Sequence, residues 1–173
     1  DARGDLARAH PVEAHGADAL LLFDNGSNAY GLDTLADRLA QIEGLDRVVI
    51  VSAPFPWGDR LIDPNGKIHR YKFLQTSLFN LAKRDFLSRA RAVLNSDIDE
   101  LIVSKGAGSV FDAAVRAPLG VIRIDGQWIY PADRAGIPGP HASNIFRPDP
   151  PRPCQGKWCA APGRGLNRVV GWN

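Results

Sequence analysis

The stretch Ala19-Leu20-Leu21-Leu22-Phe23 is a continuous apolar run that passes directly into the polar segment Asp24-Asn25-Gly26-Ser27-Asn28. A short apolar run closed by turn-forming residues is typical of a buried strand, and the lack of polar alternation favours a parallel strand. Further along the chain, Val48-Val49-Ile50-Val51 is entirely β-branched and predicts a second strand. The sequence therefore predicts a buried parallel sheet whose first strand is residues 19–23.

Amphipathic segments alternate with the predicted strands. Apolar side chains recur at helical spacing over residues 32–42 and again from Tyr71 to about Lys83. We expect a third strand at residues 90–94 and a further strand or bent pair within residues 121–130. Ser109 is the expected start of a helix that reaches about Arg116, with Asp112 completing a variant of the capping box. This order of elements predicts an α/β fold with a mainly parallel sheet flanked by helices.

The C-terminal part has a different composition. Residues 131–165 are rich in proline and glycine and show no helical period, so we expect an extended, irregular loop region laid over the sheet. A chain of 173 residues has the length of one domain, and we interpret residues 1–173 as a single domain. The chain starts at Asp1 and contains no methionine, which we interpret as the sign of a segment of a longer gene product.

Composition excludes several classes of protein. The net charge is only +2, with 21 basic and 19 acidic residues interspersed, so no nucleic-acid partner is expected. No apolar run approaches the roughly 20 residues that a membrane-spanning helix needs. Two cysteines, Cys154 and Cys159, are too few for a disulfide scaffold and favour a reducing compartment. With the histidines scattered, no zinc site is expected either.

Two polar segments follow predicted strands. Asp97 and Asp99 are two apart in an extended segment, so their carboxylates point the same way, and a divalent cation would remove their repulsion. Mg²⁺ and Mn²⁺ take one or two protein carboxylates and complete their shell with phosphate oxygens and water. If the strands are parallel neighbours, Asp24-Asn25-Gly26-Ser27 faces the same crevice. The alternative for each segment is an ordinary surface turn.

Taken together, these residues resemble a known family. The stretches that carry the resemblance are His15-Gly16-Ala17-Asp18, Asp24-Asn25-Gly26-Ser27, Gln75 and Asn95-Ser96-Asp97-Ile98-Asp99-Glu100-Leu101. Over residues 10–131 the chain is similar to the GT-A-fold glycosyltransferases of the family 2 and family 92 type, many of which make bacterial cell-surface polysaccharides. The resemblance implies a GT-A-like, Rossmann-like fold. It also implies an enzyme that moves a sugar from a nucleoside-diphosphate sugar, most simply a UDP-sugar, to a hydroxyl acceptor.

The resemblance assigns roles to individual residues. It implies that Asp97 and Asp99 coordinate Mn²⁺ or Mg²⁺ against the donor diphosphate, and that Asp24 lies near the nucleobase or ribose. Asn25 and Ser27 would support that pocket, with Gln75 as a donor contact. The acceptor would be a glycan or a lipid-linked sugar, and the protein would be cytoplasmic, at the inner face of the membrane. No catalytic base can be aligned, and the nearest candidates are Asp125, His141 and Asp149.

Three other features of the sequence each allow two interpretations. The loop Lys105-Gly106-Ala107-Gly108-Ser109 either cradles a phosphate or is a flexible loop with a helix cap. Trp128, Tyr130, Trp158 and Trp172 stack on a sugar ring or pack within the protein. Arg147, Arg152, Lys157 and Arg164 make the C-terminal region basic, either toward phosphates or as a solvated loop. The rival functions are a sugar-phosphate nucleotidyltransferase and a non-catalytic sugar- or nucleotide-binding module.

Overall fold

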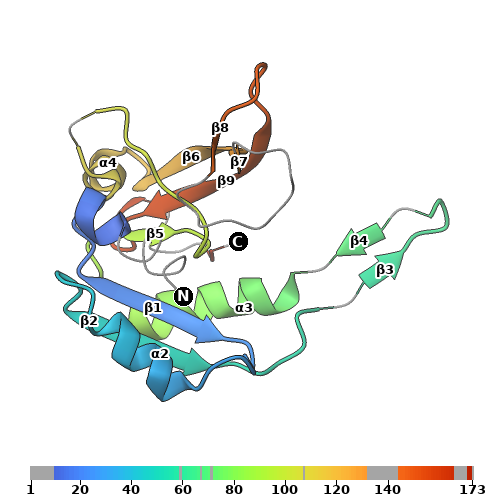
Figure 1. Cartoon of the computed structure of the whole chain (residues 1–173), viewed down its shortest axis with the longest axis horizontal. Helices are drawn as coiled ribbons and strands as arrows, with labels where there is room; N and C mark the ends of the chain where they lie inside the picture. The colour runs from blue at the N-terminus through green and yellow to red at the C-terminus, as the bar shows by residue number, and fades with distance from the viewer. Residues whose placement is uncertain are drawn as a thin grey trace.

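The computed structural model describes residues 10–58, 60–66, 68–70, 72–106, 108–131, 144–165 and 171–172 (Figure 1). Residues 10–15 are helical. The elements that follow are β1 (Ala19–Asp24), α2 (Leu32–Leu39), β2 (Arg47–Ser52), β3 (Arg60–Ile62), β4 (Ile68–Arg70), α3 (Phe73–Leu81), the π-helical turn η1 (Ala82–Phe86), β5 (Val93–Asn95), α4 (Val110–Arg116), β6 (Val121–Gln127), β7 (Tyr130–Pro131), β8 (Asn144–Phe146) and β9 (Pro153–Ala160).

The first strands and the helix between them form as predicted. β1 and β2 pair in parallel, in a register that places Leu20 beside Val48 and Asp24 beside Ser52. The connecting helix α2 packs against β2 and buries Leu35 and Leu39. The apolar run at residues 19–23 therefore lies in a β-α-β unit, and its polar continuation lies at the C-terminal end of β1.

A second, antiparallel sheet carries the larger core. Its strand order is β5-β9-β6, so β9 hydrogen-bonds to both neighbours. Helix α4 packs on this sheet, and Ile102, Val110, Ala114 and Cys159 form a buried cluster between them. The Ser109 side chain accepts a hydrogen bond of 3.1 Å from the amide of Phe111, so the predicted cap of this helix is confirmed. Asp112 bonds to the Arg91 side chain, which differs from the capping-box interpretation.

Helix α3 and its continuation η1 join the two sheets through aromatic contacts. Phe86 of η1 meets Phe23 of β1 edge to face, with ring centroids 6.5 Å apart. Phe79 of α3 meets Trp158 of β9 at 5.8 Å, and Trp158 lies 5.2 Å from the buried Trp172. Trp158 and Trp172 therefore have a packing role. The hairpin β3–β4 projects away from the rest of the molecule (Figure 1).

The predicted fold class, a GT-A-like, Rossmann-like and mainly parallel sheet, is wrong. Within the described residues the sheets are small, and β1–β2 is a parallel pair, whereas the β3–β4, β7–β8 and β5-β9-β6 pairings are antiparallel. The physical reason is the position of β9. This late strand pairs with both β5 and β6, so the third predicted strand joins an antiparallel sheet instead of extending the sheet of β1 and β2.

The expectation of an irregular C-terminal loop region is also wrong over residues 153–160. These residues form β9, the central strand of the second sheet, and Cys159 and Ala160 are fully buried. Gly156 reads in the sequence as a strand breaker. In the structure, a Cβ atom at Gly156 would lie 2.9 Å from the Ile124 carbonyl oxygen, so glycine is what allows the backbones of β9 and β6 to approach.

Candidate functional site

The polar segment after β1 organises its own loop. The Asp24 side chain is buried and accepts hydrogen bonds from the amides of Gly26 and Ser27, at 3.0 and 3.1 Å. The Asn25 amide donates to the carbonyl oxygens of Ala53 and Phe55, at 2.6 and 2.8 Å. Asn25 thereby ties the loop after β1 to the loop after β2. Ser27 Oγ lies 3.0 Å from Tyr30 Oη on the exposed side of this turn.

The charge of Asp24 is stabilised by this turn. Hydrogen bonding from the Ser27 side chain, together with the Ser27 and Gly26 amides, outweighs the effect of burial and holds the pKa of Asp24 below the usual value of 3.8. A carboxylate with a lowered pKa in the folded state stabilises the protein above its ordinary pKa, and this contribution is lost as the pH falls through the lowered value.

We expect Asp24→Asn to unfold at a lower urea concentration than the wild type at neutral pH, because the amide keeps the shape of the turn but not its charge. The difference in stability between the two proteins should shrink as the pH falls below 3.8, because protonation then removes the charge of Asp24 in the wild type as well. Urea unfolding followed by circular dichroism from neutral to acid pH measures this. Asp37→Asn on the exposed face of α2 is the control. An equal loss for Asp24→Asn at every pH would contradict the role of the charge.

The second candidate segment, residues 97–100, forms a turn after β5 that we call the acidic turn. The Asp97 amide donates to Glu100 Oε2 at 3.0 Å, and the Glu100 amide donates to the Asp97 carbonyl oxygen at 3.2 Å. These two bonds close the turn and bring the side chains of Asp97 and Glu100 to one side. Asp99, at its apex, is exposed to solvent. The predicted extended segment over residues 97–99 is therefore a turn, because the bonds between Asp97 and Glu100 bend the chain here.

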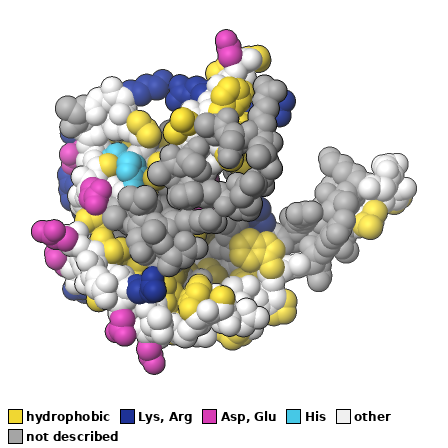
Figure 2. Space-filling view, in the orientation of Figure 1, with side chains coloured by type: hydrophobic (Ala, Val, Ile, Leu, Met, Phe, Trp, Pro, Cys, Tyr) yellow, Lys and Arg dark blue, Asp and Glu magenta, His cyan; other side chains and the backbone are white. Residues whose placement is uncertain are grey.

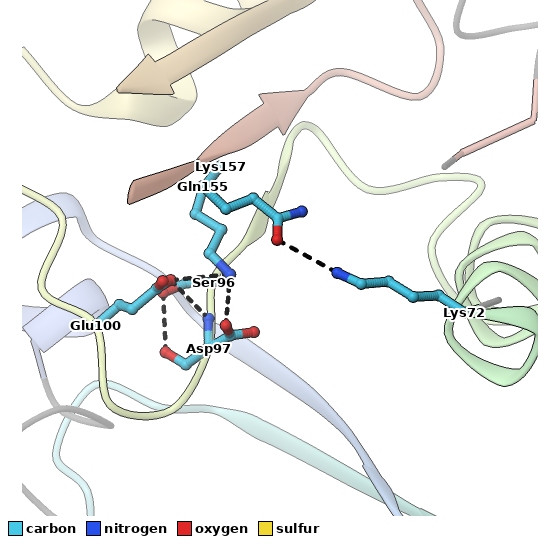
Figure 3. Close-up of polar contacts among 6 residues, drawn as sticks. All are labelled: Lys72, Ser96, Asp97, Glu100, Gln155 and Lys157. Atoms are coloured by element: carbon cyan, nitrogen blue, oxygen red, sulfur yellow. Dashed lines mark hydrogen bonds and ion pairs between the residues drawn. The ribbon is translucent and has the colours of Figure 1, made fainter. Parts of the chain in front are cut away.

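Lys157 places one positive charge against two of the three carboxylates of the acidic turn. Its ammonium lies 2.6 Å from Asp97 Oδ2 and 3.2 Å from Glu100 Oε2, and Figure 3 shows it reaching from β9 to both carboxylates. The Lys157 side chain is only 11% exposed. Burial works against its charged form, but hydrogen bonds and charges from Asp97 and Glu100 outweigh this and raise the pKa of Lys157 above its usual value. Beside it, Lys72 donates to Gln155 Oε1 at 3.3 Å, which brings a second cation toward the same side of β9.

The sequence left two interpretations for Lys157, a contact with phosphates or a place in a solvated basic loop, and neither predicted its contact with the acidic turn. The register of β9 explains the contact. Asn95 at the end of β5 lies opposite Trp158, so Lys157 stands next to the exit of the chain from β5 into the turn. The short apolar run Trp158-Cys159-Ala160-Ala161 is the signal that could have indicated a strand here.

The other predicted site residues are dispersed. Asp24 and Asp97 follow strands of different sheets, so the strand pairing does not create the predicted shared crevice. Gln75 lies half-buried on α3. Asp125 has a side chain that is 92% exposed and pairs with Arg123 at 3.5 Å. Asp149 is exposed, and His141 lies outside the described residues.

A divalent cation fits the acidic turn only if other ligands complete its shell. In the described part of the chain, no cluster of three or more His, Cys, Asp or Glu side chains is arranged to hold a metal ion. Asp97 already shares one oxygen with Lys157, while Asp99 is exposed. Mg²⁺ and Mn²⁺ nevertheless bind at sites with one or two carboxylates when substrate phosphates supply further oxygens. Asp97 and Asp99 could therefore hold a divalent cation only together with ligands from outside the protein.

Comparisons of the chain with protein-family models, with curated proteins and with solved structures found no match. Among the helices that the structure describes, none has the length and apolar character needed to cross a membrane.

Proposed function

We propose that the chain is a metal-assisted glycosyltransferase that uses a nucleoside-diphosphate sugar and transfers the sugar to a hydroxyl group of a glycan or lipid-linked acceptor. The observation that supports this most is the acidic turn at the C-terminal end of β5, with its carboxylates beside the ammonium of Lys157. The carboxylates supply negative charge for a bound cation, and the neighbouring lysine supplies positive charge for a diphosphate.

Each residue of this site has a role in the proposal. Asp97 and Asp99 would hold Mn²⁺ or Mg²⁺, which when bound supplies positive charge to the leaving nucleoside diphosphate. Glu100 closes the turn through the Asp97 amide and so orients Asp97. Lys157 holds Asp97 in place in the free protein and lies close enough to the turn to donate to a diphosphate oxygen there. Asp24 and Asn25 shape the turn after β1 in which the resemblance puts the nucleoside.

The compartment follows from the same proposal. Nucleoside-diphosphate sugars and lipid-linked acceptors would meet at the inner face of the membrane. We therefore propose a cytoplasmic protein that associates peripherally with that face. The two cysteines, too few for a disulfide scaffold, are the feature of the sequence that favours a reducing compartment.

The proposal predicts that UDP or GDP binds in the presence of Mn²⁺ and only weakly without it. Titration calorimetry with each nucleotide, with and without Mn²⁺, measures this. Asp99→Ala should weaken the metal-dependent binding by about tenfold or more, equivalent to about 1.4 kcal/mol. Asp37→Ala, on the exposed face of α2, should have no effect. A nucleotide near 100 times its Kd should raise the Tm by about 5–10 °C, because ligand binding then adds about 2.7 kcal/mol.

Variants at Lys157 distinguish its role from that of the metal. Lys157→Met leaves Asp97 and Glu100 without their internal cation, so Mn²⁺ alone should bind this variant more tightly than the wild type, by about tenfold. Lys157→Arg should keep the wild-type behaviour toward Mn²⁺. If a folded wild type binds neither nucleotide with Mn²⁺, the proposal fails. Release of pyrophosphate from a nucleoside triphosphate and a sugar phosphate would point to a nucleotidyltransferase, and nucleotide binding without sugar transfer would point to a binding module.

A further inference from the structure

A groove that neither the acidic turn nor the turn after β1 contributes to lies between α4 and β6. We call it the α4–β6 groove; its volume is about 840 Å³. One wall is formed by the segment before α4 and by α4 itself, and the other by β6 and the prolines that lead into β9. This volume lies within the range of about 300–1,000 Å³ that is usual for small-molecule sites.

Positive charge dominates the groove. Lys105, Arg116 and Arg123 line it against the carboxylate of Asp125, which pairs with Arg123. Arg116 extends back along α4 toward Gly108, since its Nη2 lies 3.6 Å from the place that a Cβ atom on Gly108 would occupy. In Figure 2, Lys and Arg side chains gather along the edge of the molecule above α4 and β6. The excess charge favours an anionic ligand.

Gln127 lines the groove, but its Nε2 atom is buried and has no hydrogen-bond partner among the described residues. Because Nε2 is buried from solvent, a ligand in the groove does not reach it. The strand register shifts between Ile124 and Gly126, and a Cβ atom on Gly126 would lie 2.5 Å from Cys154 Sγ. This irregularity immediately precedes Gln127, and it interrupts the alternation of β6 side chains between the two faces of the sheet next to the groove.

The groove also has an apolar part. Ala113 of α4, the half-buried Ile122 and Ile124 of β6, and Pro153 line it, while Val110 belongs mainly to the buried core cluster. Inorganic phosphate alone would fill only a fraction of the volume and would leave this apolar lining exposed. A ligand with an anionic group and a short hydrocarbon part matches both halves.

We propose that the α4–β6 groove binds a phosphate ester of an apolar group, with the phosphate against Arg116 and Lys105 and the apolar group along Ile122 and Ile124. Arg116 is the strongest candidate because a guanidinium can donate two parallel hydrogen bonds to a phosphate. Ser109 is not available for this purpose, since its hydroxyl caps α4 and donates to the His15 carbonyl oxygen at 2.8 Å. The site is independent of the proposed sugar transfer, which uses other residues.

The test is a calorimetric titration of the full chain with inorganic phosphate and with hexyl phosphate at low ionic strength. We expect hexyl phosphate to bind at least about tenfold more tightly, because burial of its chain adds to the phosphate contacts. Arg116→Gln should weaken the binding of both ligands about tenfold. Arg38→Gln on the exposed face of α2 is the matched control and should leave both unchanged. If Arg116→Gln does not fold, Lys105→Gln replaces it, because Lys105 is exposed and is the other residue placed against the phosphate.

Two further arms complete the test. Sedimentation with phosphatidate-containing vesicles, compared with phosphatidylcholine vesicles, distinguishes a lipid headgroup from a soluble ester, and binding in either form supports the proposal. The proposal is overturned if neither hexyl phosphate nor phosphatidate vesicles bind, or if Arg116→Gln and Arg38→Gln have the same effect. UDP binding with Mn²⁺ should be unchanged in Arg116→Gln, so failure of the groove and failure of the proposed sugar transfer are separate results.

Discussion

Gly120→Ala is expected to destabilise the protein by about 2–5 kcal/mol. Gly120 lies between α4 and β6 with φ of +69°, a left-handed conformation that costs a residue with a side chain about 1–2 kcal/mol. An added Cβ atom would also lie 2.8 Å from the Arg164 Cβ and 3.0 Å from the Arg164 carbonyl oxygen. The second contact is with backbone, which cannot rotate away. The loss is a large part of the about 5–15 kcal/mol that usually stabilises a domain.

Urea unfolding of Gly120→Ala beside Gly16→Ala separates the two causes. Gly16 has nearly the same φ of +70°, but a Cβ atom there has nothing within 4 Å. Gly16→Ala should therefore lose only the about 1–2 kcal/mol of the left-handed conformation. An equal loss in the two variants would mean that the segment at Arg164 does not pack against the start of β6.

Cys159 is expected to react with iodoacetamide far more slowly than Cys154 in the folded protein. Cys159 is fully buried, and burial outweighs the hydrogen bond of the Ala160 amide and raises the pKa of the Cys159 thiol from 9.0 to about 12. Because the thiolate is the reactive form and each pKa unit is a factor of ten, its thiolate fraction at about pH 8 falls about a thousandfold. Cys154 is only half-buried and should be alkylated first.

Mass spectrometry of peptides after timed alkylation measures this difference. In urea above the unfolding transition the two cysteines should react at similar rates, which is the internal control. Cys159 occupies the central strand of the antiparallel sheet, opposite Leu94 and Ile122. Equal rates in the folded protein would show that β9 is not the centre of that sheet.

Local patterns predicted the elements that depend on near neighbours. The apolar run at residues 19–23, the β-branched run at residues 48–51 and the amphipathic segment from residue 32 became β1, β2 and α2, because burial of a contiguous face outweighs other local preferences. Ser109 caps α4 as predicted, since a cap involves only the next two residues. These parts of the fold are determined within windows of a few residues.

The candidate site was predicted only in part for the same reason. The acidic turn follows a strand, as the sequence indicated, but its partner Lys157 is 60 residues further along the chain. A lysine among prolines and glycines carries no local sign of such a contact. Likewise, Gln127 gives no indication in the sequence that its side-chain amide is buried without an acceptor.

The apolar run at residues 19–23 and the β-branched run at residues 48–51 were sufficient to predict two strands of a parallel pair, and the polar continuation of the first run predicted a turn. Only the tertiary structure decided that Asp24 stabilises this turn, that β9 separates β5 from β6 in an antiparallel sheet, and that Lys157 pairs with the acidic turn. The physical reason is that strand order depends on pairing between distant segments. Here the pairing of β9 with β6 depends on the close approach of their backbones at Gly156. Local propensities alone would treat this glycine as a break in the strand.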